Sequence, residues 1–128
     1  SKVIFTGYRK DVPALMKHMD VIVHASTKPE PFGMVLIEAM AMGKPVVATR
    51  AGGPLDIVVD GQTGFLVEMG NSEDMAKKIV QLLLDNNLCK VMGQKGRQRV
   101  IRQFSKERYA QQVQEVYENV LCEKLSSC

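Results

Sequence analysis

Two glutamates, Glu30 and Glu38, lie eight positions apart in residues 28–43, a stretch that is otherwise nearly free of charge. Prolines on both sides of Glu30 favour an extended backbone there. Glu38 falls within an apolar run that predicts a helix over residues 32–42. Because apolar side chains occupy almost every position of this helix, we expect it to be buried on most sides. No cationic residue lies three or four positions from Glu38, so a buried Glu38 would need a partner from outside the helix.

The start of this helix is suited to an anion. Gly33 lets the backbone approach a ligand closely, and the free N–H groups and dipole of a helix N-terminus favour negative charge. With a rise of about 1.5 Å per residue, Glu38 lies roughly 8 Å along the axis from Gly33. A carboxylate, an anion site and a second carboxylate in line would suit a sugar, a diphosphate and a ribose.

Residues 30–48, EPFGMVLIEAMAMGKPVVA, carry a family resemblance. They resemble the E-x7-E signature of the retaining GT-B glycosyltransferases of family 4, the glycosyl transferases group 1, and the similarity runs over residues 3–121. It implies that Glu30 is a catalytic residue that contacts hydroxyls of the donor sugar and that Glu38 binds the ribose of the nucleotide. The donor-binding residues that it implies are Phe32, Gly33, Met34, Glu38, Gly52 and Gly53.

Alternatives remain at these positions. Glu38 alone is compatible with a buried helix that tolerates one glutamate, and Gly52-Gly53 is compatible with a plain strand-to-helix turn. The family usually has glutamate where Asp56 stands, so the part played by Asp56 stays open. Turn chemistry is favoured over ligand chemistry at Asp60, Gly61 and Gly64.

The resemblance also implies a function. It predicts that the chain binds a nucleotide diphosphate sugar, without a metal or other cofactor, for retaining transfer of a hexose-type sugar to an acceptor. In this family an N-terminal domain binds the acceptor, and the Arg and Lys that neutralise the diphosphate precede the position matching Ser1. We therefore expect a donor-binding part that is inactive alone and that lacks its N-terminal partner domain. The alternative is a non-enzymatic nucleotide-binding or interaction module of the same architecture.

Composition limits the other functions. The chain has 128 residues, of which 45% are hydrophobic and 24% charged, as in an ordinary globular domain. A net charge of +3 and the absence of Trp do not favour nucleic acid as a partner. Cys89, Cys122 and Cys128 show no C-x-x-C spacing, which favours a reducing cytoplasm. His18 and His24 have no metal-ligand partner at suitable spacing, so we expect both to be structural.

A basic run follows in the last third of the chain. It comprises Lys95, Arg97, Arg99, Arg102, Lys106 and Arg108, with Glu107 as its one acid. A solvated face is the favoured interpretation, and peripheral contact with an anionic membrane is the alternative. No apolar run near 18 residues predicts a membrane span.

The alternation of apolar runs and helical segments predicts an α/β fold, a Rossmann-like parallel sheet with flanking helices. Strands are expected at residues 3–5, 21–24, 46–49 and 65–67. Helix N-caps are expected at Asp11, at Asn71 or Ser72, and at Ser105, and Gly93 and Gly96 should interrupt the helical last third. We expect residues 1–121 to form the domain and 122–128 a tail.

The resemblance suggests how the first strand is placed. It corresponds to the C-terminal half of a GT-B fold, with strand order 3-2-1-4-5-6, truncated at its N-terminal side so that two strands between residues 3–5 and 21–24 are missing. Residues 3–5 should then pair directly with residues 21–24 or join a second copy in a strand-swapped dimer. The missing strands could instead lie outside the chain, in a longer parent protein.

Overall fold

The computed structural model describes residues 2–126, which fold around a parallel three-stranded sheet. Its strands are β1 (Ile22–His24), β2 (Val46–Thr49) and β3 (Gly64–Val67), in the order β1-β2-β3. Every residue of β2 and of β3 is buried. Short apolar strands of this kind are typical of parallel sheets covered on both faces.

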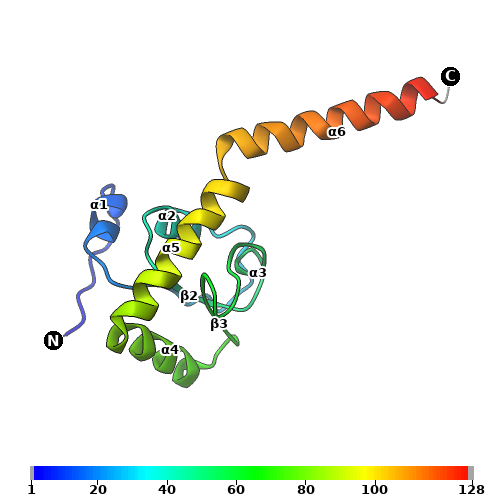
Figure 1. Cartoon of the computed structure of the whole chain (residues 1–128). Helices are drawn as coiled ribbons and strands as arrows, with labels where there is room; N and C mark the ends of the chain where they lie inside the picture. Colours follow the sequence, from blue (N-terminus) through cyan, green and yellow to red (C-terminus); the bar gives the residue numbers. More distant parts are fainter. Residues whose placement is uncertain (1, 127–128) are drawn as a thin grey trace.

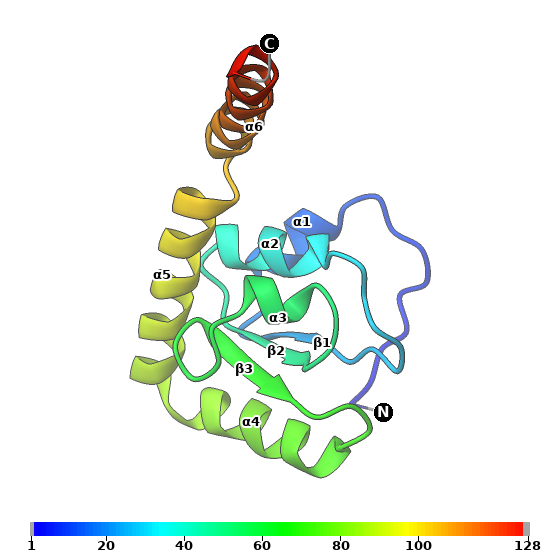
Figure 2. The same ribbon diagram turned by 90° about the vertical axis from the view of Figure 1, so that its right-hand side faces the viewer.

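Helices cover the sheet on both faces, which confirms the predicted α/β architecture. In Figure 2, α2 and α3 lie over one face, α4 lies under the other, and α5 runs along the flank. Figure 1 shows α6 projecting from this body. The bounds are α1 (Val12–Lys17), α2 (Met34–Ala41), α3 (Pro54–Ile57), α4 (Ser72–Leu84), α5 (Asn86–Gln103) and α6 (Lys106–Ser126). No helix of the described residues is long and apolar enough to cross a bilayer.

The strand β2 divides the core into two clusters. Val46 and Ala48 pack with Leu36 and Met40 of α2 on one face of the sheet, and Val47 packs on the other with side chains that include Leu82 of α4. This division follows from the alternation of side chains along a strand. Burial of each large aliphatic side chain contributes about 1.5–3 kcal/mol, so the two clusters hold the sheet between its helices.

The strand predictions were right for three segments and wrong for the first. Residues 3–5 form no strand, and the side chains of Ile4 and Phe5 are 84% and 94% exposed. Their predicted pairing with residues 21–24 is therefore absent, and β1 has β2 as its one strand neighbour among the described residues. An apolar run becomes a strand only where a sheet edge accepts its backbone hydrogen bonds. Pairing with a second copy stays a prediction.

Helix α5 runs without a break through Gly93 and Gly96, so the predicted interruption was wrong. A Cβ atom at Gly93 would overlap the carbonyl oxygen of Gly43, and one at Gly96 would lie 3.3 Å from the carbonyl oxygen of Thr63. These glycines let α5 approach the neighbouring backbone closely, and this contact offsets their low helix propensity.

Side chains at helix N-termini largely follow the predictions. Asn71 Oδ1 accepts a hydrogen bond from the N–H of Asp74 at 3.0 Å, and Ser105 Oγ accepts one from the N–H of Arg108 at 3.2 Å. Asp11 occupies the N-cap position of α1 but makes no capping hydrogen bond, because its carboxylate accepts from Arg9 instead.

The expected tail, residues 122–128, begins within α6. The helix continues through residues 122–126, which were assigned to that tail, and the last two residues of the tail lie outside the described part of the chain.

Candidate functional site

Two loops meet beyond the carboxyl ends of β1 and β2, where open α/β sheets bind their ligands. One loop leads from His24 towards α2, and the other leads from Thr49 towards α3. The buried hydroxyl of Thr49 joins their starting points. It accepts a hydrogen bond from the N–H of Ser26 at 3.1 Å and donates one to the carbonyl oxygen of His24 at 3.3 Å.

Gly52 and Gly53 bring the second loop onto the first. Gly52 forms an isolated parallel bridge with Glu30, and the N–H of Gly53 donates to the carbonyl oxygen of Glu30 at 2.6 Å. A Cβ atom at Gly52 would overlap that same oxygen, and one at Gly53 would overlap the carbonyl oxygen of Phe32. The glycine pair therefore positions the Glu30 loop, and its direct contact with a donor stays a prediction.

Gly33 turns the first loop into α2. Its φ of +87° lies in the left-handed region, which glycine adopts without the steric cost of a side chain. The helix begins at the next residue, Met34. The first N–H groups of a helix have no acceptor within it, so they can bind an anion at this end, as the sequence predicted.

Helix α2 is buried on one face rather than on most sides, and this corrects the prediction. Leu36, Ala39 and Met40 are fully buried against the sheet. On the opposite face Met34 is 54% exposed, and Glu38 is exposed as well. This face is open to solvent and, at Met34, to a cavity beside the start of α6. Because Glu38 is exposed, it needs no partner to offset the cost of burial. It remains a candidate ligand residue because it lies one turn from Met34, beside the helix N-terminus.

His24 lies beside Glu30, a neighbour that sequence reasoning missed. Its Nε2 is 3.8 Å from Oε2 of Glu30, and the two side chains are 18% and 40% exposed. The Nδ1 atom is buried without a hydrogen-bond partner among the described residues. The place of His24 beside Glu30 supplies one neighbouring carboxylate, but no group of three possible metal ligands forms around it within the described residues. The six-residue separation carried no signal, since the loop must fold back along Gly52 to bring Glu30 to the end of β1.

Arg50 and Asp60 fix the base of the second loop. Arg50 Nη2 is 2.5 Å from Oδ2 of Asp60, and its Nε is 3.0 Å from Oε1 of Glu68. Asp60 Oδ1 also accepts from the N–H of Leu66 at 2.9 Å. Desolvation raises the pKa of Asp60, but the Leu66 hydrogen bond and the Arg50 guanidinium lower it further, so the net pKa lies below its usual value. The predicted structural role of Asp60 is confirmed.

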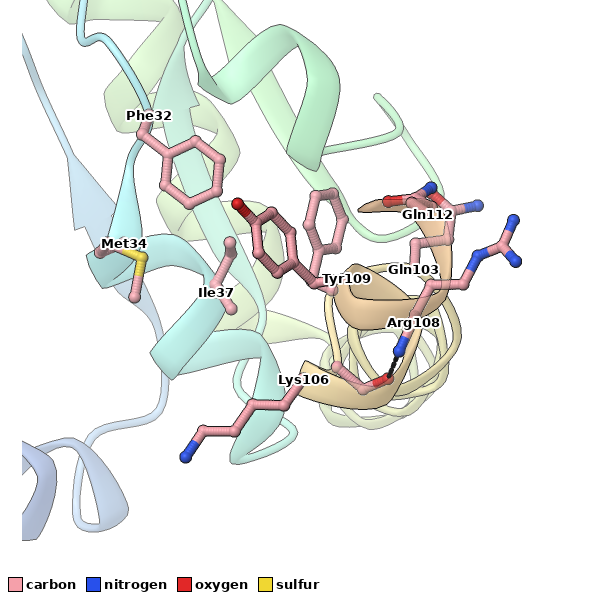
Figure 3. A pocket seen from close by; sticks show the side chains of 10 residues that line it. Phe32, Met34, Ile37, Gln103, Lys106, Arg108, Tyr109 and Gln112 are labelled. Atoms are coloured by element: carbon pink, nitrogen blue, oxygen red, sulfur yellow. Dashed lines mark hydrogen bonds between the residues drawn. The ribbon is translucent and has the colours of Figure 1, made fainter. Parts of the chain in front are cut away.

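A cavity of about 610 Å³ lies on the side-chain side of the first loop. Phe32, Met34 and Ile37 line it together with the start of α6, and Figure 3 shows Phe32 and Ile37 facing Tyr109 across it. Neither Glu30 nor Glu38 contributes to its lining. The resemblance implies that Phe32 and Met34 bind the donor through their backbone N–H groups. Their side chains line this cavity instead.

The described residues hold no group of three His, Cys, Asp or Glu side chains that could bind a metal ion. The site consists of backbone N–H groups, two carboxylates and one imidazole, which are placed by the end of β1, two loops and the first two turns of α2. Carboxylates accept hydrogen bonds from hydroxyl groups, and backbone N–H groups donate to phosphate oxygens. The arrangement can therefore bind a ligand that has both hydroxyls and phosphates.

Comparison with known proteins shows to which family this chain belongs. The profile of the family described as "Glycosyl transferases group 1" matches residues 1–99. This chain belongs to the glycosyl transferases group 1 family. The N-acetyl-alpha-D-glucosaminyl L-malate synthase of Bacillus anthracis is a similar protein. It is 38% identical over 120 residues, which cover 94% of this chain and 31% of the relative. The lipopolysaccharide core biosynthesis glycosyltransferase LpsE of Rhizobium meliloti is 37% identical over 83% of this chain and 31% of its own length.

Solved structures confirm the predicted part of the GT-B fold. The Anabaena protein HepE, crystallised with UDP-glucose, superposes with a TM-score of 0.85 and is 37% identical over 93% of this chain and 33% of its own. The C-terminal domain of a glycosyl transferase group 1 family protein from Francisella tularensis gives a TM-score of 0.71 at 33% identity, over 81% of this chain and 53% of its own. The chain spans about a third of the length of the curated relatives that it matches.

Proposed function

We propose that this chain is the donor-binding part of a retaining glycosyltransferase, which transfers a hexose-type sugar from a nucleoside diphosphate to an acceptor. One observation carries the proposal. The Glu30 loop, the N-terminus of α2 and the Gly52-Gly53 turn meet at the carboxyl ends of β1 and β2. The similarity to HepE, whose crystal structure contains UDP-glucose, supports a UDP-sugar as the donor.

Each part of the donor is assigned to a different group of the site. The diphosphate binds at the first N–H groups of α2, where the left-handed conformation of Gly33 turns the loop into the helix and the helix dipole favours negative charge. Glu38, about one turn beyond, accepts hydrogen bonds from the ribose hydroxyls. Glu30 contacts the hydroxyls of the sugar, and Nε2 of His24 lies 3.8 Å from its carboxylate.

Transfer requires more than these groups. We propose that an acceptor domain and additional cations for the diphosphate belong to a longer protein, because two similar proteins are about three times as long as this chain. This chain would then bind the donor without turning it over. The free thiols of Cys89 and Cys122 support the further proposal that the protein works in the cytoplasm.

Titration calorimetry of the purified chain with UDP-glucose tests the proposal. Glu38→Ala should weaken binding of UDP by roughly 1.5–3 kcal/mol, the value of a hydrogen bond to a charged group. It should leave the unfolding free energy within about 0.5 kcal/mol of the wild type, because the side chain is exposed. Glu115→Ala, which removes another exposed glutamate from α6, is the control and should leave binding unchanged.

Two results would contradict this assignment. If the wild-type chain does not bind UDP or UDP-glucose at millimolar concentration, the site is not a donor site in this chain. If Glu38→Ala and Glu115→Ala bind UDP equally well, Glu38 is not a ribose ligand. Saturation-transfer NMR on the same samples would identify which part of the donor contacts the protein.

A further inference from the structure

Helix α5 carries charged side chains of one sign only, and the donor site does not explain them. Between Asn86 and Gln103 it carries five basic residues and no acidic residue. Lys106, Glu107 and Arg108 follow it. Residues 86–108 thus hold seven basic side chains against one acidic, whereas the rest of the chain holds ten basic against thirteen acidic. The basic residues of α5 are Lys90, Lys95, Arg97, Arg99 and Arg102.

The helical repeat arranges these residues as two basic edges. Met92, Gly93, Gly96 and Val100 form the buried face of α5. At 3.6 residues per turn, the middle of the opposite face is a stripe of two aliphatic and two amide side chains. Lys90 and Arg97 flank it on one edge, and Lys95, Arg99 and Arg102 flank it on the other. The stripe consists of Val91, Gln94, Gln98 and Ile101.

This outward face is open to solvent. Val91 and Ile101 are 39% and 58% exposed, and Lys90, Lys95, Arg97 and Arg102 are exposed as well. Figure 2 shows α5 on the flank of the body, with no element drawn outside it. We call this surface the α5 face and define it by Val91, Ile101 and these four basic residues.

The four basic residues of the α5 face make no ion pair within residues 2–126, although Arg50 and Lys77 elsewhere do. Arg99 is different, because it donates to the carbonyl oxygens of Asp56 and Ile57 at 2.7 Å and so closes the end of α3. An ordinary solvated surface mixes charges of both signs. The α5 face has one sign only, which favours a negatively charged partner.

We propose that the α5 face binds the surface of an anionic lipid bilayer, with the helix axis parallel to the membrane. Basic side chains near such a surface are attracted to acidic headgroups, and their aliphatic stems can lie along the interface. Val91 and Ile101, between the two basic edges, would enter the headgroup region. The face carries no aromatic ring on which a nucleic-acid base could stack, so a membrane fits better than a single-stranded nucleic acid.

Sedimentation with vesicles tests this proposal on the chain as it stands. Vesicles of phosphatidylcholine with 30% phosphatidylglycerol should bind the chain at 50 mM salt, and vesicles of pure phosphatidylcholine should not. Binding should weaken strongly at 500 mM salt, because exposed charges are screened. The variant Lys90→Gln/Lys95→Gln/Arg97→Gln/Arg102→Gln removes the basic edges. Each residue should contribute roughly fivefold, so this variant should bind on the order of several hundredfold more weakly.

The control removes four positive charges elsewhere, as Lys2→Gln/Lys10→Gln/Lys17→Gln/Lys77→Gln, and these lysines are exposed. It should retain binding to the acidic vesicles within about fivefold. A second variant, Ile101→Ser, keeps all charges and should lower the affinity severalfold if the stripe enters the headgroup region. Circular-dichroism melting checks that each variant is folded.

Three results would overturn the proposal. The first is no binding of the chain to acidic vesicles at 50 mM salt. The second is an equal loss of affinity in both four-residue variants, which would indicate a response to net charge alone. The third is tighter binding to a DNA duplex than to acidic vesicles at the same salt, with loss in the α5 variant, which would assign the face to nucleic acid. Unchanged binding by Ile101→Ser would show that the attraction is electrostatic without insertion, which contradicts the apolar contact.

Discussion

Substitution of Gly53 by alanine isolates the close approach of the two site loops. The φ of Gly53 is −51°, so the change meets no left-handed strain of the kind that Gly52, at +64°, would add. The new Cβ would overlap the carbonyl oxygen of Phe32 and displace the hydrogen bond from Gly53 to Glu30. A helical conformation before Pro54 is also unfavourable once a Cβ is present.

The expected magnitude follows from these contacts. Overpacking against a fixed group costs about 1–3 kcal/mol, and the lost hydrogen bond costs about 1 kcal/mol. We therefore expect Gly53→Ala to lower the unfolding free energy by roughly 2–4 kcal/mol. In urea titrations followed by circular dichroism, this is a large part of the 5–15 kcal/mol typical of small domains. Affinity for UDP-glucose should fall too, because the Glu30 loop moves.

Gly96→Ala is the control for this experiment. Its Cβ would lie 3.3 Å from Thr63 O and 3.5 Å from the flexible side chain of Met40, while alanine gains roughly 1 kcal/mol of helix propensity over glycine. Its unfolding free energy should stay within about 1 kcal/mol of the wild type. If Gly53→Ala costs less than Gly96→Ala, or leaves donor binding intact, the glycine pair does not position the loop.

Three other predictions concern single sites. Glu30→Gln should weaken UDP-glucose in calorimetry but leave UDP unchanged, since UDP lacks the sugar that Glu30 touches; equal losses would place Glu30 elsewhere. Gly93→Ala should destabilise the fold by about 1–3 kcal/mol in urea titrations, because its Cβ overlaps Gly43 O, and a stabilised variant would contradict the packing of α5. The lowered pKa of Asp60 contributes stability above its unfolded pKa, and this is lost as pH falls through the folded pKa. Asp60→Asn should therefore show a smaller loss of melting temperature on acidification below about pH 4 than the wild type, and parallel curves would exclude the contribution.

Sequence patterns predicted the three strands of the sheet because a short apolar run bounded by turn residues is a local signal of a buried strand. Residues 46–49 are apolar or β-branched, and their strand has the predicted bounds. The same pattern failed at residues 3–5, since hydrogen bonding to a sheet edge is not a local property. The spacing of Glu30 and Glu38 likewise located both carboxylates but could not show that His24 lies beside the first.

The errors at α2 and α5 have a common physical cause. The apolar character of α2 predicted burial all round, but burial requires a neighbour on each face, and Glu38 is exposed. Glycine at positions 93 and 96 predicted a break, because the sequence does not show which backbone the helix approaches. Both properties depend on elements that are distant along the chain.

The junction between α5 and α6 determines where this domain could be exchanged between enzymes. The family profile stops at residue 99, one position before Val100, which is buried in the core together with Leu36 and Met40. A chimaera joined after residue 99 would therefore replace a core side chain, and Phe104, which packs on the same cluster, would change with it. The junction belongs after Phe104, where α5 has ended and Ser105 caps the next helix, so that a foreign C-terminal helix can be attached without cutting into the folded unit.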